Sequence, residues 1–196
     1  DYGSKVELIA IADEGYYFES WSDGVVEESR IIEATIDIDL IAKFAVNTYS
    51  VVLHAENGNV YGAGVYEHGT EVTLTAEPNE GYHFVRWSDG NNNAIRTIEL
   101  TSNVELTAEF SKEIREIIVN TENGVVSGAG RYAYGATVVL SAIPNEGYHF
   151  VGWSDGVTDV VRTIIVFSDT TLFAEFALNS YKVTLIAENG SVYGSG

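Results

Sequence analysis

The 196-residue chain contains no cysteine, no methionine and only two prolines. Without cysteine it can form no disulfide framework and no thiolate metal site, and thiol redox chemistry is excluded. No window reaches the roughly 18 consecutive apolar residues that a membrane-spanning helix needs, and the first residues lack the charged and apolar regions of a signal peptide. The sequence therefore predicts no membrane insertion.

Basic residues are also scarce. Ten Lys and Arg stand against 29 Asp and Glu, a formal net charge of -19. Binding to phosphate backbones or anionic membrane surfaces needs clustered cations, so nucleic acid and membrane partners are not expected. The chain is nevertheless 45% hydrophobic and holds 3 Trp, 12 Tyr and 8 Phe. That content predicts a packed core and not a disordered acidic tail.

An internal repeat organises the whole sequence. The tetrapeptide Trp-Ser-Asp-Gly occurs at 21–24, 87–90 and 153–156, so both steps are 66 residues. Residues 47–112 and 113–178 align without insertion and are identical at 32 of 66 positions. Loops normally tolerate insertions, so the unbroken spacing indicates either recent duplication or a selected constant pitch, as in a stalk or fibre.

Within each repeat the apolar residues alternate with polar ones. Residues 71–77 and 104–110 show this period of two, which is typical of half-buried strands, and no segment shows a convincing helical period. The Asn-Gly pairs at 57–58, 123–124 and 189–190, and the Asp-Gly pair after each tryptophan, predict tight hairpins. We therefore expect an all-β chain with about five short strands per repeat.

The motif Gly-Tyr-x-Phe-x-x-Trp-Ser-Asp-Gly, or its variant with a second Tyr, begins at Gly15, Gly81 and Gly147, and an Ala-x-Phe strand follows each copy. In three correctly phased copies, this pattern resembles the divergent internalin B-type repeat, also called the Listeria-Bacteroides repeat, over essentially the whole chain. The resemblance implies small β-grasp-like units in tandem, in secreted or wall-attached microbial proteins, as stalk or adhesive modules. It carries over no catalytic residues and no cofactor.

The repeated aromatic residues are the candidate structural core. Strict alternation would place the Phe and Trp of each motif, three residues apart, on opposite faces, so either both faces are covered or a bulge turns them together. The alternative function is a platform on which sugars stack. The predicted core comprises Tyr16, Phe18, Trp21, Phe44, Tyr82, Phe84, Trp87, Phe110, Tyr148, Phe150, Trp153 and Phe176.

Each Asp of the tetrapeptide has an arginine seven residues further on. The predicted salt bridges are Asp23 with Arg30, Asp89 with Arg96, and Asp155 with Arg162. A calcium loop is the alternative, but the position that would need glycine is Ala94 in the best copy, and the other copies lack the ligand pattern. We expect no metal site and no cofactor.

Four segments follow from the repeat: an incomplete first repeat at 1–46, complete repeats at 47–112 and 113–178, and the opening hairpin of a further repeat at 179–196. An incomplete sheet and a lone hairpin both need a partner. The chain is therefore expected to be a window of a longer array, to join head to tail by donating its hairpin, or to close on itself as a ring. The predicted assembly hairpin is carried by Tyr181, Val183, Leu185, Ala187, Asn189 and Gly190.

No phosphate loop, nucleophile elbow or repeated carboxylate pair is present, so no enzyme is predicted. The sequence predicts a non-catalytic structural segment of an extracellular microbial surface or filament protein, whose partners are further repeats of the same protein. The alternative is an adhesive module that binds glycans or a host protein through its aromatic residues or Asp-Gly loops.

Overall fold

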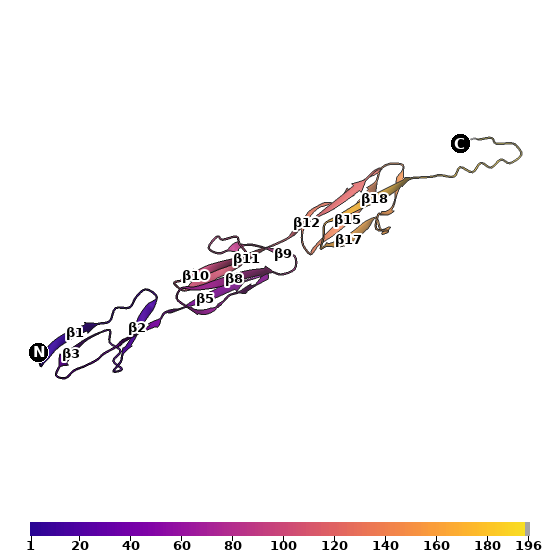
Figure 1. The fold of residues 1–196 in the computed structure, drawn as a ribbon. Coiled ribbons are helices and arrows are strands. Elements are labelled where there is room, and N and C mark those ends of the chain that lie inside the picture. The colour runs from indigo at the N-terminus through magenta and orange to yellow at the C-terminus, as the bar shows by residue number, and fades with distance from the viewer. Residues whose placement is uncertain (195–196) are drawn as a thin grey trace. The chain divides into compact units, whose positions relative to one another are not determined.

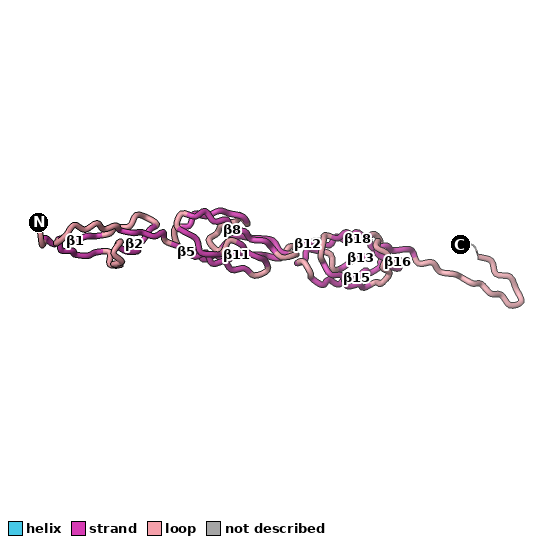
Figure 2. Tube along the Cα trace, turned by 60° about the horizontal axis from the view of Figure 1, so that its bottom comes forward, coloured by secondary structure: helices cyan, strands magenta, loops and turns pink. Residues whose placement is uncertain are grey.

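The computed structural model describes residues 1–194, and every regular element among them is a β-strand (Figures 1 and 2). The predicted all-β fold is confirmed. The chain divides into two compact units, one covering residues 1–111 and the other beginning at residue 112. We call residues 1–46, 47–112 and 113–178 the first, second and third repeats.

The second repeat consists of two facing sheets. Its strands are β5 (Thr48–Ala55), β6 (Gly58–Tyr61), β7 (Gly64–Glu67), β8 (Thr70–Pro78), β9 (Tyr82–Trp87), β10 (Ile95–Leu100) and β11 (Val104–Lys112). One sheet has the order β7-β5-β11-β9 and the other the order β10-β8-β6. The first and last strands, β5 and β11, are parallel neighbours, while the other pairings that we describe are antiparallel.

The third repeat has the same arrangement, and each strand begins 66 residues after its counterpart. Its strands are β12 (Ile114–Thr121), β13 (Gly124–Ser127), β14 (Gly130–Ala133), β15 (Ala136–Pro144), β16 (Tyr148–Trp153), β17 (Val161–Val166) and β18 (Thr170–Leu178). The sheet orders are β14-β12-β18-β16 and β13-β15-β17, with β12 and β18 parallel.

The first repeat has two two-stranded sheets. They pair β1 (Ser4–Ile9) with β3 (Ser29–Ala34), and β2 (Tyr16–Trp21) with β4 (Ala42–Val46). These four strands correspond to β8, β10, β9 and β11 of the second repeat. Residues 1–46 contain no counterparts of β5, β6 and β7.

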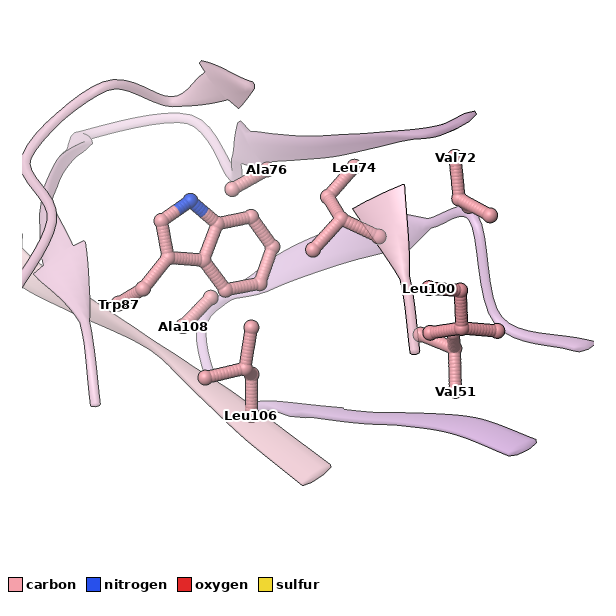
Figure 3. Packing of buried hydrophobic residues seen from close by; sticks show 8 residues of the cluster. All are labelled: Val51, Val72, Leu74, Ala76, Trp87, Leu100, Leu106 and Ala108. Carbon is pink, nitrogen blue, oxygen red and sulfur yellow. The ribbon is translucent and has the colours of Figure 1, made fainter. Parts of the chain in front are cut away.

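The alternating pattern produces the core. In β8, Val72, Leu74 and Ala76 are buried, while the residues between them are exposed or half-buried. Figure 3 shows these side chains converging with Trp87 and Leu106 from the facing sheet. Because each sheet offers one apolar face, the two sheets together exclude water from a separate core in each complete repeat.

The prediction of hairpins at the Asn-Gly and Asp-Gly pairs is wrong. Strands β5 and β6 flank Asn57-Gly58 but lie in different sheets, and so do β9 and β10 on either side of Asp89-Gly90. Asn57 has a φ of 64° and Gly90 a φ of 88°, so these turns do use left-handed backbone. Instead of joining neighbouring strands, they carry the chain from one sheet to the other. The number of strands per complete repeat is seven and not about five, because β6 and β7 are four-residue strands with little alternation to detect.

The predicted opening hairpin at 179–196 is not formed in the part that the structure describes. Residues 179–194 contain no strand, and residues 195–196 lie outside the described residues. In the complete repeats the corresponding strands are held by pairing with the body that follows them, β8 and β11 in the second repeat.

We predict that Gly58→Ala destabilises the second repeat by about 1–3 kcal/mol, because a Cβ at this position would lie 2.4 Å from the Phe110 ring and 2.7 Å from the Glu77 carbonyl oxygen. Gly190→Ala is the matched control, since it alters the same Asn-Gly pair at a position where no atom of the described residues lies within 4 Å of the added Cβ. Urea denaturation of dilute protein, followed by circular dichroism, should shift one transition for the first variant and none for the second. Equal midpoints would contradict the close packing at Gly58.

Candidate functional site

The Phe and Trp of the repeated aromatic motif pack together in the core of each repeat. A register shift between Phe18 and Ser20, and another between Phe150 and Gly152, turns the Phe and Trp of each strand to the same face. The Phe and Trp ring centroids are 5.5, 5.7 and 5.5 Å apart in the three repeats. Of the two arrangements that the sequence allowed, the bulge is the one that the structure shows.

The tryptophans have almost no open surface. Trp21, Trp87 and Trp153 are 7%, 0% and 2% exposed. The other predicted core residues are buried at Phe18 and half-buried at Tyr82, Phe84, Phe110, Tyr148, Phe150 and Phe176. A sugar ring needs an open aromatic face, so this arrangement gives the tryptophans no role in stacking.

Two predicted core residues, Tyr16 and Phe44, are instead 49% and 38% exposed. The equivalents of Phe44 in the complete repeats lie against the glycine of the Asn-Gly turn: a Cβ at Gly58 or Gly124 would be 2.4 Å from the Phe ring. Residues 1–46 contain no Asn-Gly turn, and Phe44 packs edge-on against Phe18 with the ring centroids 5.8 Å apart. Tyr16 lies at the start of β2, whereas its counterparts Tyr82 and Tyr148 are half-buried.

Backbone and side-chain hydrogen bonds fix the turn after each tryptophan. The Trp87 indole N–H donates to the Asn93 carbonyl oxygen at 3.0 Å, and the same bond is 2.9 Å for Trp21 and 2.8 Å for Trp153. The Ser88 hydroxyl oxygen accepts the Thr107 amide at 3.1 Å. The polar atoms of the repeated tetrapeptide therefore have partners inside the chain.

The three aspartates contact the arginines seven residues further on. The closest nitrogen–oxygen distances are 2.7 Å for Asp23 with Arg30, 2.5 Å for Asp89 with Arg96 and 2.7 Å for Asp155 with Arg162. The Arg162 guanidinium also lies 5.8 Å from the centre of the Trp153 ring. The pairs thus tie the turn of one sheet to the next strand of the other.

These contacts act on the acidity of the aspartates. The hydrogen bond from arginine is the largest cause, and it holds the pKa of Asp23, Asp89 and Asp155 below the ordinary value, while partial desolvation opposes it. In the second repeat the Asp89 carboxylate also accepts the Asn91 amide at 3.1 Å. Within residues 1–194 no three His, Asp or Glu side chains lie close enough together to hold a metal ion.

A junction that the sequence analysis missed lies between the first and second repeats. The Asn47 amide donates to the Gly15 carbonyl oxygen at 2.8 Å, and the His68 amide donates to the Asn47 carbonyl oxygen at 2.8 Å. The His68 ring lies so close to Gly15 that a Cβ there would be 2.2 Å away. The available signal in the sequence is the repetition of Gly15 as Gly81 and Gly147, which also belongs to the aromatic motif.

A shallow groove recurs in the two complete repeats. Residues 54–57 and 107–110 line a groove of about 590 Å³, and residues 120–123 and 173–176 line one of about 700 Å³. Each groove is lined by two glutamates, Glu56 and Glu109 in the second repeat and Glu122 and Glu175 in the third, and Glu109 is paired with Arg86 at 2.9 Å. The sequence analysis missed it because the groove is created by the parallel pairing of the first and last strands of each repeat.

The fold and the repeated turns after the tryptophans define a tandem all-β repeat protein. The chain belongs to the divergent InlB B-repeat domain family, whose model matches residues 1–48, 49–114 and 116–180. The family resemblance predicted from the sequence is thereby confirmed.

Two relatives come from Evansella cellulosilytica. One, named "Putative membrane protein", is 27% identical over 93% of this chain, and the other, named "Putative Gly-rich membrane protein", is 26% identical over 92%. The chain spans 29% and 23% of their lengths. In the portion of the chain that the structure describes, no helix has the length and apolarity needed to cross a bilayer.

We predict that Arg96→Gln returns the pKa of Asp89 toward about 3.8. Since the folded-state pKa is depressed, the pair contributes stability above the unfolded pKa, and this contribution is lost as the pH falls through the folded pKa. Two-dimensional NMR of the carboxyl carbon measures the titration directly. Arg131→Gln, which removes a charge from an exposed position on β14, is the control and should leave Asp89 unchanged. An unaltered Asp89 titration in Arg96→Gln would contradict the assignment.

Proposed function

We propose that this chain is a non-catalytic structural segment of an extracellular microbial surface protein, in which the repeats act as a spacer or stalk. Membership of a repeat family and the names of the relatives support a surface location. The use of the motif's polar atoms in internal bonds supports a structural role, because such atoms are not free for substrate chemistry. A net charge of -19 would discourage lateral clumping of neighbouring molecules.

The observation that carries the proposal is the way in which consecutive repeats are joined. Strand β4 ends at Val46 and β5 begins at Thr48, and β11 ends at Lys112 before β12 begins at Ile114. A single residue therefore separates the last strand of one repeat from the first strand of the next. Force applied along the chain would pass from strand to strand with no slack linker to extend first.

The topology of each complete repeat suits it to bear that force. Tension enters the second repeat at the start of β5 and leaves at the end of β11, and these strands are parallel neighbours paired from Val51 with Val104 to Ala55 with Ala108. Pulling the two ends apart slides one strand past the other, so the hydrogen bonds of the ladder are loaded together. The adjacency of first and last parallel strands also supports the description of each repeat as a helix-free, β-grasp-like unit with a 66-residue pitch.

Adhesion to a glycan or host protein is the second candidate. The feature that favours it is the recurrent groove lined by glutamates, and not the buried aromatic residues. The complete repeats present that groove at equivalent positions, so a partner with repeated cationic groups would match it. The tryptophans are buried, and the aspartates of the Asp-Gly turns are already paired with arginines.

Single-molecule stretching tests the structural role. Pulled by its two termini, the chain should show two high-force unfolding events, each releasing about 200 Å, the length of roughly 65 extended residues less the folded span.

Thr48→Cys with Glu67→Cys provides a matched comparison, because the chain has no native cysteine and these residues face each other on antiparallel β5 and β7. Pulling through these cysteines opens hydrogen bonds one at a time and should need much less force. Equally low forces in both geometries would contradict the mechanical role of the repeats.

A further inference from the structure

We propose that the third repeat pairs with the third repeat of a second copy of this chain, through the outer face of the sheet β13-β15-β17. The contact would be two-fold, so that the same apolar face serves on both molecules. This inference goes beyond the proposed spacer role, since it concerns how neighbouring molecules associate. Its test depends neither on cell-surface location nor on mechanical strength.

The outer face of this sheet is apolar. Alternation turns one set of residues in each strand toward the core and the other set toward solvent. The solvent set contains five aliphatic side chains that are between 53% and 60% exposed, namely Val125, Val139, Ile143, Val161 and Ile165. They come from all three strands, and the β13–β15 ladder places Val125 directly opposite Ile143.

These side chains form one continuous patch. Where β15 pairs with β17, aliphatic residues lie opposite small hydroxyl-bearing ones, in the pairs Ile165 with Thr137, Val139 with Thr163 and Val161 with Ser141. Five aliphatic side chains that are more than half exposed amount to roughly 500 Å² of apolar surface, in the upper part of the range for the largest patch on a typical monomer. Patches of this size commonly serve as interaction sites.

The second repeat shows that the fold does not require this apolar face. The two repeats have the same strand order and register. In the second repeat, however, the positions of the five aliphatic residues are occupied by Asn59, Thr73, Glu77, Ile95 and Glu99. The equivalent of Thr137 is a further glutamate, Glu71. Three glutamates on this face are therefore replaced by uncharged residues in the third repeat, although folding does not demand the change.

The rest of the third repeat keeps its charges. Strands β13, β15 and β17 contain no Asp, Glu or Lys, and the side chain of their one charged residue, Arg162, is 15% exposed and paired with Asp155. The strands of the other sheet carry Glu116 and Glu175 at exposed positions. Two chains of net charge -19 repel each other, and the repulsion is smallest where the contact itself holds no carboxylate.

A second copy is the occupant that charge and area favour. A cationic partner would be better matched by the glutamate-bearing faces, and an anionic partner is repelled by the chain as a whole. A flat, uncharged sheet of β-branched residues can pack on an equivalent sheet about 10 Å away, as the two sheets inside each repeat do. With the intervening Thr and Ser, each copy would bury about 600 Å², the lower limit for specific interfaces. The dimer should therefore be reversible and form at micromolar concentration.

Sedimentation equilibrium of the full chain, from low to high micromolar concentration, tests this contact. Ile143→Glu with Ile165→Glu introduces the residues that the second repeat already carries as Glu77 and Glu99, so the fold accommodates them. We expect the unsubstituted chain to reach the mass of a dimer and no more. The double variant should dissociate at least roughly 100-fold more readily, because two carboxylates from each copy would be buried without partners.

The matched control is Ile118→Glu with Val151→Glu. It adds the same charge in place of two aliphatic residues that are each 45% exposed, but on strands of the other sheet. This variant should form dimers as the unsubstituted chain does. Circular dichroism of both variants establishes that the repeats remain folded.

Salt dependence provides a second measurement, which needs no substitution. Added NaCl screens the repulsion between two acidic chains, and an apolar contact has no ion pair to lose, so the dimer should become tighter. Association through ion pairs would instead become weaker, which would contradict the apolar contact.

Four sedimentation results would overturn the inference. They are an unsubstituted chain that stays monomeric throughout the concentration range, growth beyond the dimer, equal association of all three proteins, and equal loss of association in both double variants. Any of them would leave the single-molecule test of the spacer role unaffected.

Discussion

The parallel pairing of the first and last strands holds each complete repeat together. When β5 pairs with β11, and β12 with β18, the opening strands also supply the apolar residues Val51 and Ile117 to the cores. The first repeat shows the consequence of lacking this pairing: its strands shorten, and Val6 and Phe44 become partly exposed. A small sheet without disulfides has little apolar area to spare, so one ladder determines whether the unit closes.

The repeated Trp-Ser-Asp-Gly segment forms the turn through which the chain leaves one sheet and enters the other. The buried indole donates its N–H to a carbonyl oxygen, the serine bonds the neighbouring strand, and the aspartate holds an arginine of the facing sheet. Each of these bonds recurs in all three repeats, including the first. The turn after each tryptophan therefore forms without the opening strands. Its dependence on these bonds explains why the tetrapeptide is the most regular feature of the sequence.

Much of the local structure could be predicted from the sequence. Alternation predicted strands such as β8 and β11, and the seven-residue spacing brought Asp89 to Arg96. Pairing between distant segments could not be predicted from local patterns. Asn57-Gly58, for example, is a residue pair typical of hairpin turns, but it joins strands of different sheets. The contact of His68 with Gly15 was also missed, since it depends on how the first and second repeats meet and not on any local pattern.

Amide hydrogen exchange on the dilute, monomeric chain tests the central role of the opening strand most directly. Residues 104–107 and 170–173 have a parallel partner strand, whereas the equivalent residues 38–41 have none. We predict slow exchange in the first two segments and fast exchange in the third, measured by NMR or by mass spectrometry of overlapping peptides. Equal protection of all three segments would show that the repeat closes without its opening strands, and would contradict this account.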